Sequence, residues 1–211
     1  MPTMNFFFDF ISPYAYLAFK RITKIIGTDH AISYRPVLFA GLLNHFGQLG
    51  PAEIPGKREW TFTQSLWEAK QHQIPLQLPK KHPFNPLPYL RLALNRSEAG
   101  EAQRATCEKI FDHIWQTGTD PSSPVSLNSL VEKLDGDPNV NDPGAKDALR
   151  INTNNAIAAG VFGVPTVLVD GHLFWGFDSM DMLRHHLSGD STFAEYWDKA
   201  SAIGVAIERK R

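Results

Sequence analysis

The sequence predicts an α/β protein in which a small sheet domain is interrupted by a long, mainly helical insertion. Strand-like and helical runs alternate at both ends of the chain, whereas residues 40–155 carry helical apolar stripes and irregular Gly/Pro-rich stretches. The length of 211 residues is enough for one domain with an insertion. We therefore predict a sheet domain from residues 1–39 and 156–211 and an insertion domain from residues 40–155.

The first segment reads as a strand, a tight turn and a helix. An apolar run over residues 5–11 stops at Ser12-Pro13, and a helical apolar pattern starts at Tyr14. Proline suits the first turn of a helix, so Ser12 is expected at a helix N-terminus. Free N–H groups and the helix dipole favour a bound anion there, such as a thiolate. The alternative is that Ser12 only caps the helix.

The middle of the chain alternates between irregular and helical segments. A second strand is predicted over residues 31–38, with Pro36 near its end. Residues 47–56 are rich in Gly and Pro, and residues 75–88 hold five prolines, so both are expected to be irregular. Helical patterns are predicted over residues 60–69, from residue 90 onward, and over residues 102–114, 127–134 and 145–159.

The C-terminal part returns to strands and a helix. Two β-rich runs, residues 166–169 and 172–175, flank Asp170-Gly171, which is a strong signal for a hairpin. A helix is predicted from Ser179. The order of strand, helix, strand, helical insertion, hairpin and helix predicts a thioredoxin-like fold split by a helical domain.

The cysteine count limits the chemistry of such a fold. Thioredoxin-type proteins carry Cys-x-x-Cys at the first strand-helix junction, where this chain has Ser12 and Ala15. Cys107 is the only cysteine, so an intrachain disulfide and dithiol oxidoreductase chemistry are excluded. Cys107 lies in a helical pattern and is predicted to be a packed structural thiol. A thiolate at Ser12 must come from elsewhere, and glutathione is the obvious donor.

Composition argues against several classes of partner. The chain has 21 basic and 22 acidic residues, a formal net charge of −1, which gives no reason to expect nucleic-acid or membrane-surface binding. No signal peptide and no apolar stretch of about 18 residues is visible, so a cytoplasmic location is expected. No metal-ligand spacing or nucleotide motif appears, and no metal is predicted.

Three further positions have both a functional and an ordinary interpretation. Val164-Pro165 precedes the hairpin: it is either strand punctuation or a cis-proline whose neighbouring backbone pairs with a peptide-like ligand. Asp178 either caps the last helix or binds the α-ammonium of a γ-glutamyl group. Lys57 is either a solvated surface residue or a partner for a glutathione carboxylate.

Five segments, in order along the chain, resemble the 2-hydroxychromene-2-carboxylate isomerase family. That family is related to the kappa-class glutathione transferases within the DsbA-like thioredoxin superfamily. The match is carried by FDFISPYAYL (residues 8–17), IPGK (54–57), HPFNPL (82–87), GVFGVPT (160–166) and FWGFD (174–178).

The resemblance implies a glutathione site. By this likeness Ser12 would stabilise the glutathione thiolate, Lys57 would bind a carboxylate, Val164 beside Pro165 would pair its backbone with the cysteinyl part, and Asp178 would take the γ-glutamyl ammonium. Members of the family are commonly dimeric, so a homodimer is expected on the same ground.

The chain departs from the family pattern near the cofactor. Gln48, an expected cofactor contact, stands where the kappa-type pattern has Asn. Phe177 and Ser179 flank Asp178 where relatives often carry a polar residue and an arginine, and Ser179 is the second expected contact of this kind.

The resemblance also suggests walls for an aromatic substrate. These are Trp67 and the segment Phe84-Asn85-Pro86, with core packing as the alternative role.

By this resemblance the reaction would be a glutathione-dependent isomerisation of 2-hydroxychromene-2-carboxylate to its ring-opened benzylidenepyruvate, or of a close analogue, in aromatic hydrocarbon catabolism. Two alternatives stay open. A kappa-type glutathione transferase would use the same thiolate but release a conjugate. A non-catalytic protein of this fold would bind a peptide or partner along the cis-proline groove. We favour the isomerase because its branch of the family has the closer motifs.

Overall fold

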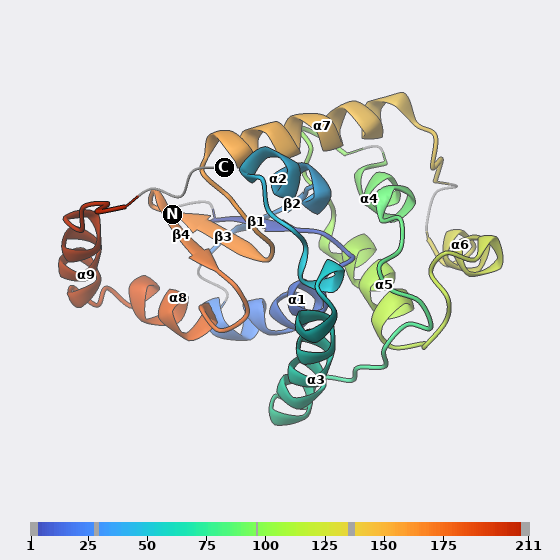
Figure 1. Cartoon of the computed structure of the whole chain (residues 1–211). Helices are drawn as coiled ribbons and strands as arrows, with labels where there is room; N and C mark the ends of the chain where they lie inside the picture. Colours follow the sequence, from blue (N-terminus) through green and yellow to red (C-terminus); the bar gives the residue numbers. More distant parts are fainter. Residues whose placement is uncertain (1–3, 28–29, 96, 135–137, 208–211) are drawn as a thin grey trace.

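The computed structural model describes residues 4–27, 30–95, 97–134 and 138–207 (Figure 1). The strands are β1 (Met4–Phe8), β2 (Ile32–Pro36), β3 (Thr166–Val169) and β4 (His172–Trp175). The helices are α1 (Pro13–Ile26), α2 (Phe39–Phe46), the short 3-10 helix η1 (Pro51–Glu53), α3 (Pro55–Gln71), α4 (Leu87–Leu94), α5 (Arg104–Trp115), α6 (Pro124–Val131), α7 (Pro143–Ala158), α8 (Met180–Leu187) and α9 (Thr192–Ser201).

The strands form one mixed sheet in the order β2-β1-β3-β4. β1 runs parallel to β2, with Phe6 opposite Tyr34, and antiparallel to β3, with Phe6 opposite Val167. The predicted hairpin is confirmed: β3 and β4 are antiparallel, and both turn residues have positive φ, 51° at Asp170 and 79° at Gly171. Positive φ at both central residues is the requirement of a type I′ turn.

Both faces of the sheet are covered, so β1 is apolar on both sides. The side chains of Phe6 and Phe8 enter the larger core on the α1 and α5 side, whereas Phe7 enters a smaller core with Val37 and Leu42 on the α2 and α7 side. Figure 1 shows α7 and α2 over one face and α1 below the other. The end of β1, from which the chain turns into α1, is therefore held between two packed layers.

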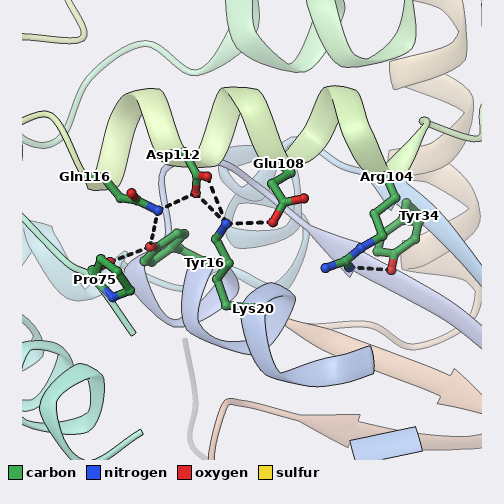
Figure 2. Close-up of polar contacts among 8 residues, drawn as sticks. All are labelled: Tyr16, Lys20, Tyr34, Pro75, Arg104, Glu108, Asp112 and Gln116. Atoms are coloured by element: carbon green, nitrogen blue, oxygen red, sulfur yellow. Dashed lines mark hydrogen bonds and ion pairs between the residues drawn. The ribbon is translucent and has the colours of Figure 1, made fainter. Parts of the chain in front are cut away.

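A polar network also connects α1 to α5 (Figure 2). Lys20 on α1 binds Glu108 at 2.8 Å and Asp112 at 2.7 Å, both on α5. The Tyr16 hydroxyl donates to the carbonyl of Pro75 and accepts from Gln116 at 3.0 Å. Aromatic packing adds to these polar contacts, because the rings of Tyr16 and Phe19 on α1 lie 6.0 Å and 5.0 Å from Phe111 on α5.

The α/β fold class with a helical segment between β2 and β3 is confirmed, and the division into two domains stays a prediction. Some expected boundaries are wrong. β1 ends at Phe8 and not at residue 11, because the chain turns at Asp9, whose carbonyl accepts from the Ser12 N–H at 3.1 Å. β2 is confined to Ile32–Pro36.

Residues 47–56 and 75–88 were expected to be irregular, but the last residues of each segment are helical. α4 begins at Leu87 with Pro88 in its first turn, and α3 begins at Pro55, so it includes Gly56. Proline is tolerated there because the N–H groups in the first turn of a helix have no hydrogen-bond partner within the helix. α9 was not predicted. Among the described residues, no helix has both the length and the apolar character needed to cross a membrane.

The prediction for Cys107 as a packed thiol is confirmed. Its side chain is fully buried in α5, and burial raises the pKa of the thiol well above its ordinary value. We expect the native protein not to react with an aromatic disulfide reagent on the minute timescale, and the unfolded protein to release one equivalent. Rapid labelling of the native protein would contradict this placement.

Candidate functional site

A cavity of about 650 Å³ lies at the N-terminus of α1. Its walls come from the turn between β1 and α1, from residues 39–68, from the loop around residues 82–86, and from the two ends of the hairpin, residues 162–165 and 175–178. This size is typical of sites for small organic ligands. Segments far apart in the sequence therefore meet at the edge where α1 begins.

Ser12 is both the N-cap of α1 and a cavity-lining residue. Its backbone is extended, with φ −93° and ψ 120°, and its Oγ accepts a hydrogen bond from the Ala15 N–H at 3.2 Å. That bond uses a lone pair of the oxygen, so the hydroxyl hydrogen stays available; within the described part of the chain, no acceptor takes it. The capping role and a donor role toward a ligand are therefore compatible.

Asp9 lies fully buried behind this turn and also lines the cavity. Its two carboxylate oxygens accept from the N–H groups of Ile11 at 3.1 Å and Phe39 at 2.9 Å. Desolvation by burial raises the pKa of Asp9 to about 7, against the effect of these hydrogen bonds. Asp9 was not among the predicted site residues, although an acid inside the run Phe-Asp-Phe was a usable signal.

The Val164–Pro165 peptide bond is cis, as predicted. The Pro165 carbonyl accepts from the Gly176 N–H at 2.9 Å, whereas no hydrogen bond joins the Val164 backbone to another described residue. Both residues line the cavity. A strand-like backbone with free N–H and C=O groups can pair with an extended ligand.

Asp178 lines the same cavity and does not cap α8. The N-cap of α8 is Ser179, whose hydroxyl donates to the Gly176 carbonyl at 2.9 Å. Gly176 has φ 91°, and a Cβ there would collide with the Asp178 carboxylate. Glycine at this position therefore permits the turn that places the carboxylate at the cavity.

Lys57 lies in the first turn of α3 and lines the cavity, as does Gln48, which follows α2. Among the described residues, no carboxylate forms an ion pair with Lys57, so its ammonium is available to an anionic ligand. The neighbouring Arg58, which the sequence analysis missed, also lines the cavity and donates to the His82 carbonyl at 2.7 Å.

The residues suggested as substrate walls separate into two groups. Phe84 and Pro86 line the cavity. Trp67 and Asn85 do not line it: Trp67 is 57% exposed, and the Asn85 side chain accepts from the Leu87 N–H at 3.1 Å. Ser179, which was expected to contact the cofactor, does not line the cavity either. Contacts of these three residues with a ligand stay predictions.

Aromatic residues that the sequence analysis did not select complete the walls. Phe162 and Trp175 face each other edge to face, with ring centroids 5.0 Å apart. A Cβ at Gly163 would lie 2.6 Å from the Trp175 indole nitrogen, so the glycine makes room for this ring. The Tyr14 hydroxyl, also at the cavity, donates to the Gln64 side chain at 2.8 Å.

Comparison with known proteins identifies the family of the chain. Residues 3–188 match the model of the DSBA-like thioredoxin domain. A 2-hydroxychromene-2-carboxylate isomerase of Sphingobium xenophagum is 28% identical over 194 residues, which cover 88% of this chain and 97% of the relative. Glutathione S-transferase kappa 2 of Caenorhabditis elegans is 29% identical over 191 residues, covering 80% and 82%.

A solved structure gives the same result for the fold. The structure of a 2-hydroxychromene-2-carboxylate isomerase superposes with a TM-score of 0.75 at 24% sequence identity, covering 96% of this chain and 100% of that one. The predicted thioredoxin-like fold with a helical insertion is confirmed.

Proposed function

The chain belongs to the DSBA-like thioredoxin domain family, and we propose that it is a glutathione-dependent isomerase. Its substrate would be 2-hydroxychromene-2-carboxylate, the benzylidenepyruvate derived from it, or a close aromatic analogue. The observation that carries the proposal is the Ser12 hydroxyl, which lines the cavity at the N-terminus of α1 and has a hydrogen left to donate.

A thiol nucleophile cannot come from the chain itself. Cys107 is the only cysteine and is fully buried in α5, so no protein thiol reaches the cavity. When bound, glutathione would supply a thiolate that adds to an electrophilic carbon of the substrate and is eliminated again after rotation about the former double bond. An amide-rich helix N-terminus and a hydroxyl donor favour the charged form of a thiol.

The cavity residues fit the functional groups of glutathione. Lys57 would pair with a carboxylate, the Val164 backbone would pair with the peptide portion, and the Asp178 carboxylate would accept from the α-ammonium. Gln48 would add a polar contact beside Lys57. Aromatic walls at Phe84 and Trp175 suit a flat substrate ring.

Glutathione transfer is the second candidate, supported by the similarity to kappa transferases of other organisms. It would use the same residues but would consume one glutathione per turnover. Binding of a peptide or partner protein along the cis-proline groove needs no thiolate, and the available hydroxyl hydrogen of Ser12 favours the two enzymatic candidates over it.

We expect a small fraction of an equivalent of glutathione to equilibrate many equivalents of 2-hydroxychromene-2-carboxylate, because the thiol that adds is also the thiol that leaves. The benzylidenepyruvate absorbance follows the reaction, and free thiol is counted at its end. Omission of glutathione is the control. Turnover that stops when the glutathione is consumed would establish the transferase, and the absence of both turnover and glutathione binding would favour the partner-binding protein.

A further inference from the structure

The loop between α3 and α4 brings an imidazole against the turn that carries Ser12. The His82 Nε2 lies 2.8 Å from the carbonyl oxygen of Ile11, a residue 71 positions away in the sequence. A carbonyl oxygen only accepts, so the proton of this hydrogen bond is on Nε2. The Ile11 carbonyl belongs to the peptide unit that leads directly into Ser12.

A second ring holds the preceding carbonyl in the same manner. The Trp115 Nε1 at the end of α5 donates to the Phe10 carbonyl at 2.9 Å. β1 ends at Phe8, so the carbonyls of Phe10 and Ile11 lie beyond the hydrogen bonding of the sheet. Carbonyls that are shielded from water need donors, and here two side chains from the inserted helical region supply them to the buried Phe10 and the half-buried Ile11.

The environment of His82 fixes its ring. The imidazole packs edge to face on Phe62, with centroids 5.0 Å apart, and against Trp115 at 6.1 Å. Desolvation by burial lowers the pKa of His82, which keeps the ring neutral. Its Nδ1 is buried and has no hydrogen-bond partner among the described residues, and the ring forms part of the cavity wall.

We propose that His82 is a positioning residue for the reaction: through its Nε2–H it fixes the Ile11 carbonyl and so orients the Ser12 hydroxyl and the first N–H groups of α1 toward the bound sulfur. This inference rests on the proposed function. It assigns to the helical insertion the task of setting the geometry of the thiolate site, because both ring donors come from that part of the chain.

Two substitutions separate the hydrogen bond from the ring packing. His82→Gln keeps an N–H donor near the Nε2 position but removes the aromatic ring, whereas His82→Phe keeps the ring and removes the donor. We expect His82→Phe to lower kcat about 10-fold or more, with a smaller change in KM, because small errors in orientation are costly. It should also raise the pKa of bound glutathione, and His82→Gln should restore both quantities toward the wild-type values.

Hydrogen exchange provides a measurement that does not depend on glutathione. In His82→Phe, the hydrogen-bonded amides of Ser12, Ala15 and Tyr16 should exchange at least several-fold faster than in the wild type, whereas in His82→Gln they should stay protected. Equal protection, or loss of protection in His82→Gln alone, would overturn the proposal in favour of simple packing. If the wild-type protein does not bind glutathione, the proposed function fails, but the exchange pattern still decides the role of His82.

Discussion

Replacing Ser12 by alanine is expected to raise the pKa of protein-bound glutathione by about one to two units. One charge-assisted hydrogen bond contributes roughly 1.5–3 kcal/mol, and one pKa unit corresponds to about 1.4 kcal/mol. The rate at neutral pH should fall about 10-fold or more, since less of the bound thiol is ionised. Ultraviolet absorbance of the bound thiolate against pH measures the shift directly.

Two variants control for the helix cap that Ser12→Ala also removes. Ser12→Thr keeps a hydroxyl and should retain a low thiol pKa. Asp142→Ala removes the N-cap of α7, where the side chain accepts from the Gly144 N–H at 3.0 Å, and should cost about 1 kcal/mol of stability without affecting the titration. An unchanged thiol pKa in Ser12→Ala would reduce Ser12 to a helix cap.

Replacing Asp9 by asparagine is expected to change how the stability of the protein depends on pH. The pKa of Asp9 is raised to about 7 in the folded protein by burial, from 3.8. The native state therefore holds a proton that the unfolded state has lost, and its stability falls as pH rises through this range. From about pH 5 to pH 8 the wild type should lose roughly 2–3 kcal/mol relative to Asp9→Asn, which has no proton to lose.

Denaturant unfolding at several pH values measures this difference in the free energy of unfolding. Asp147→Asn is the matched control: the Asp147 side chain is exposed and, within the described part of the chain, forms an ion pair only with Arg150 on the same helix, so the substitution should leave the pH dependence nearly unchanged. If the stability difference between wild type and Asp9→Asn is the same at every pH, then Asp9 is ionised throughout and its pKa is not raised.

Much of the fold follows from local patterns in the sequence. A few neighbouring residues are enough to predict the Ser12-Pro13 junction, the Asp170-Gly171 hairpin and the helical stripes of the insertion. Such signals are reliable because helix capping, turn conformation and amphipathic periodicity act over short stretches of chain. The ends of the elements also depend on contacts that local patterns do not show. β1 stops at Phe8 because the buried Asp9 carboxylate, three residues before Ser12, organises the turn.

The residues of the candidate site also fall into those that local motifs predict and those that they do not. Ser12, Lys57, Val164 and Asp178 were found from the sequence because each stands in a motif, and all four line the cavity. The residues that hold them were not predicted, because their partners lie far away in the sequence. Asp9 accepts from Phe39, and Trp115 donates to a carbonyl 105 positions earlier.

Three features can be read from the sequence without the structure: the order of the elements, the lack of a second cysteine and the place of Ser12 at a helix N-terminus. Only the folded chain reveals that His82, Trp115 and Asp9 hold the Ser12 turn. It also reveals that Phe162 and Trp175 form a wall of the cavity, whereas Trp67 faces solvent. The physical reason is distance along the chain. Local preferences act between neighbours, but the partners of a buried carbonyl or carboxylate are chosen by packing between segments that the sequence keeps far apart.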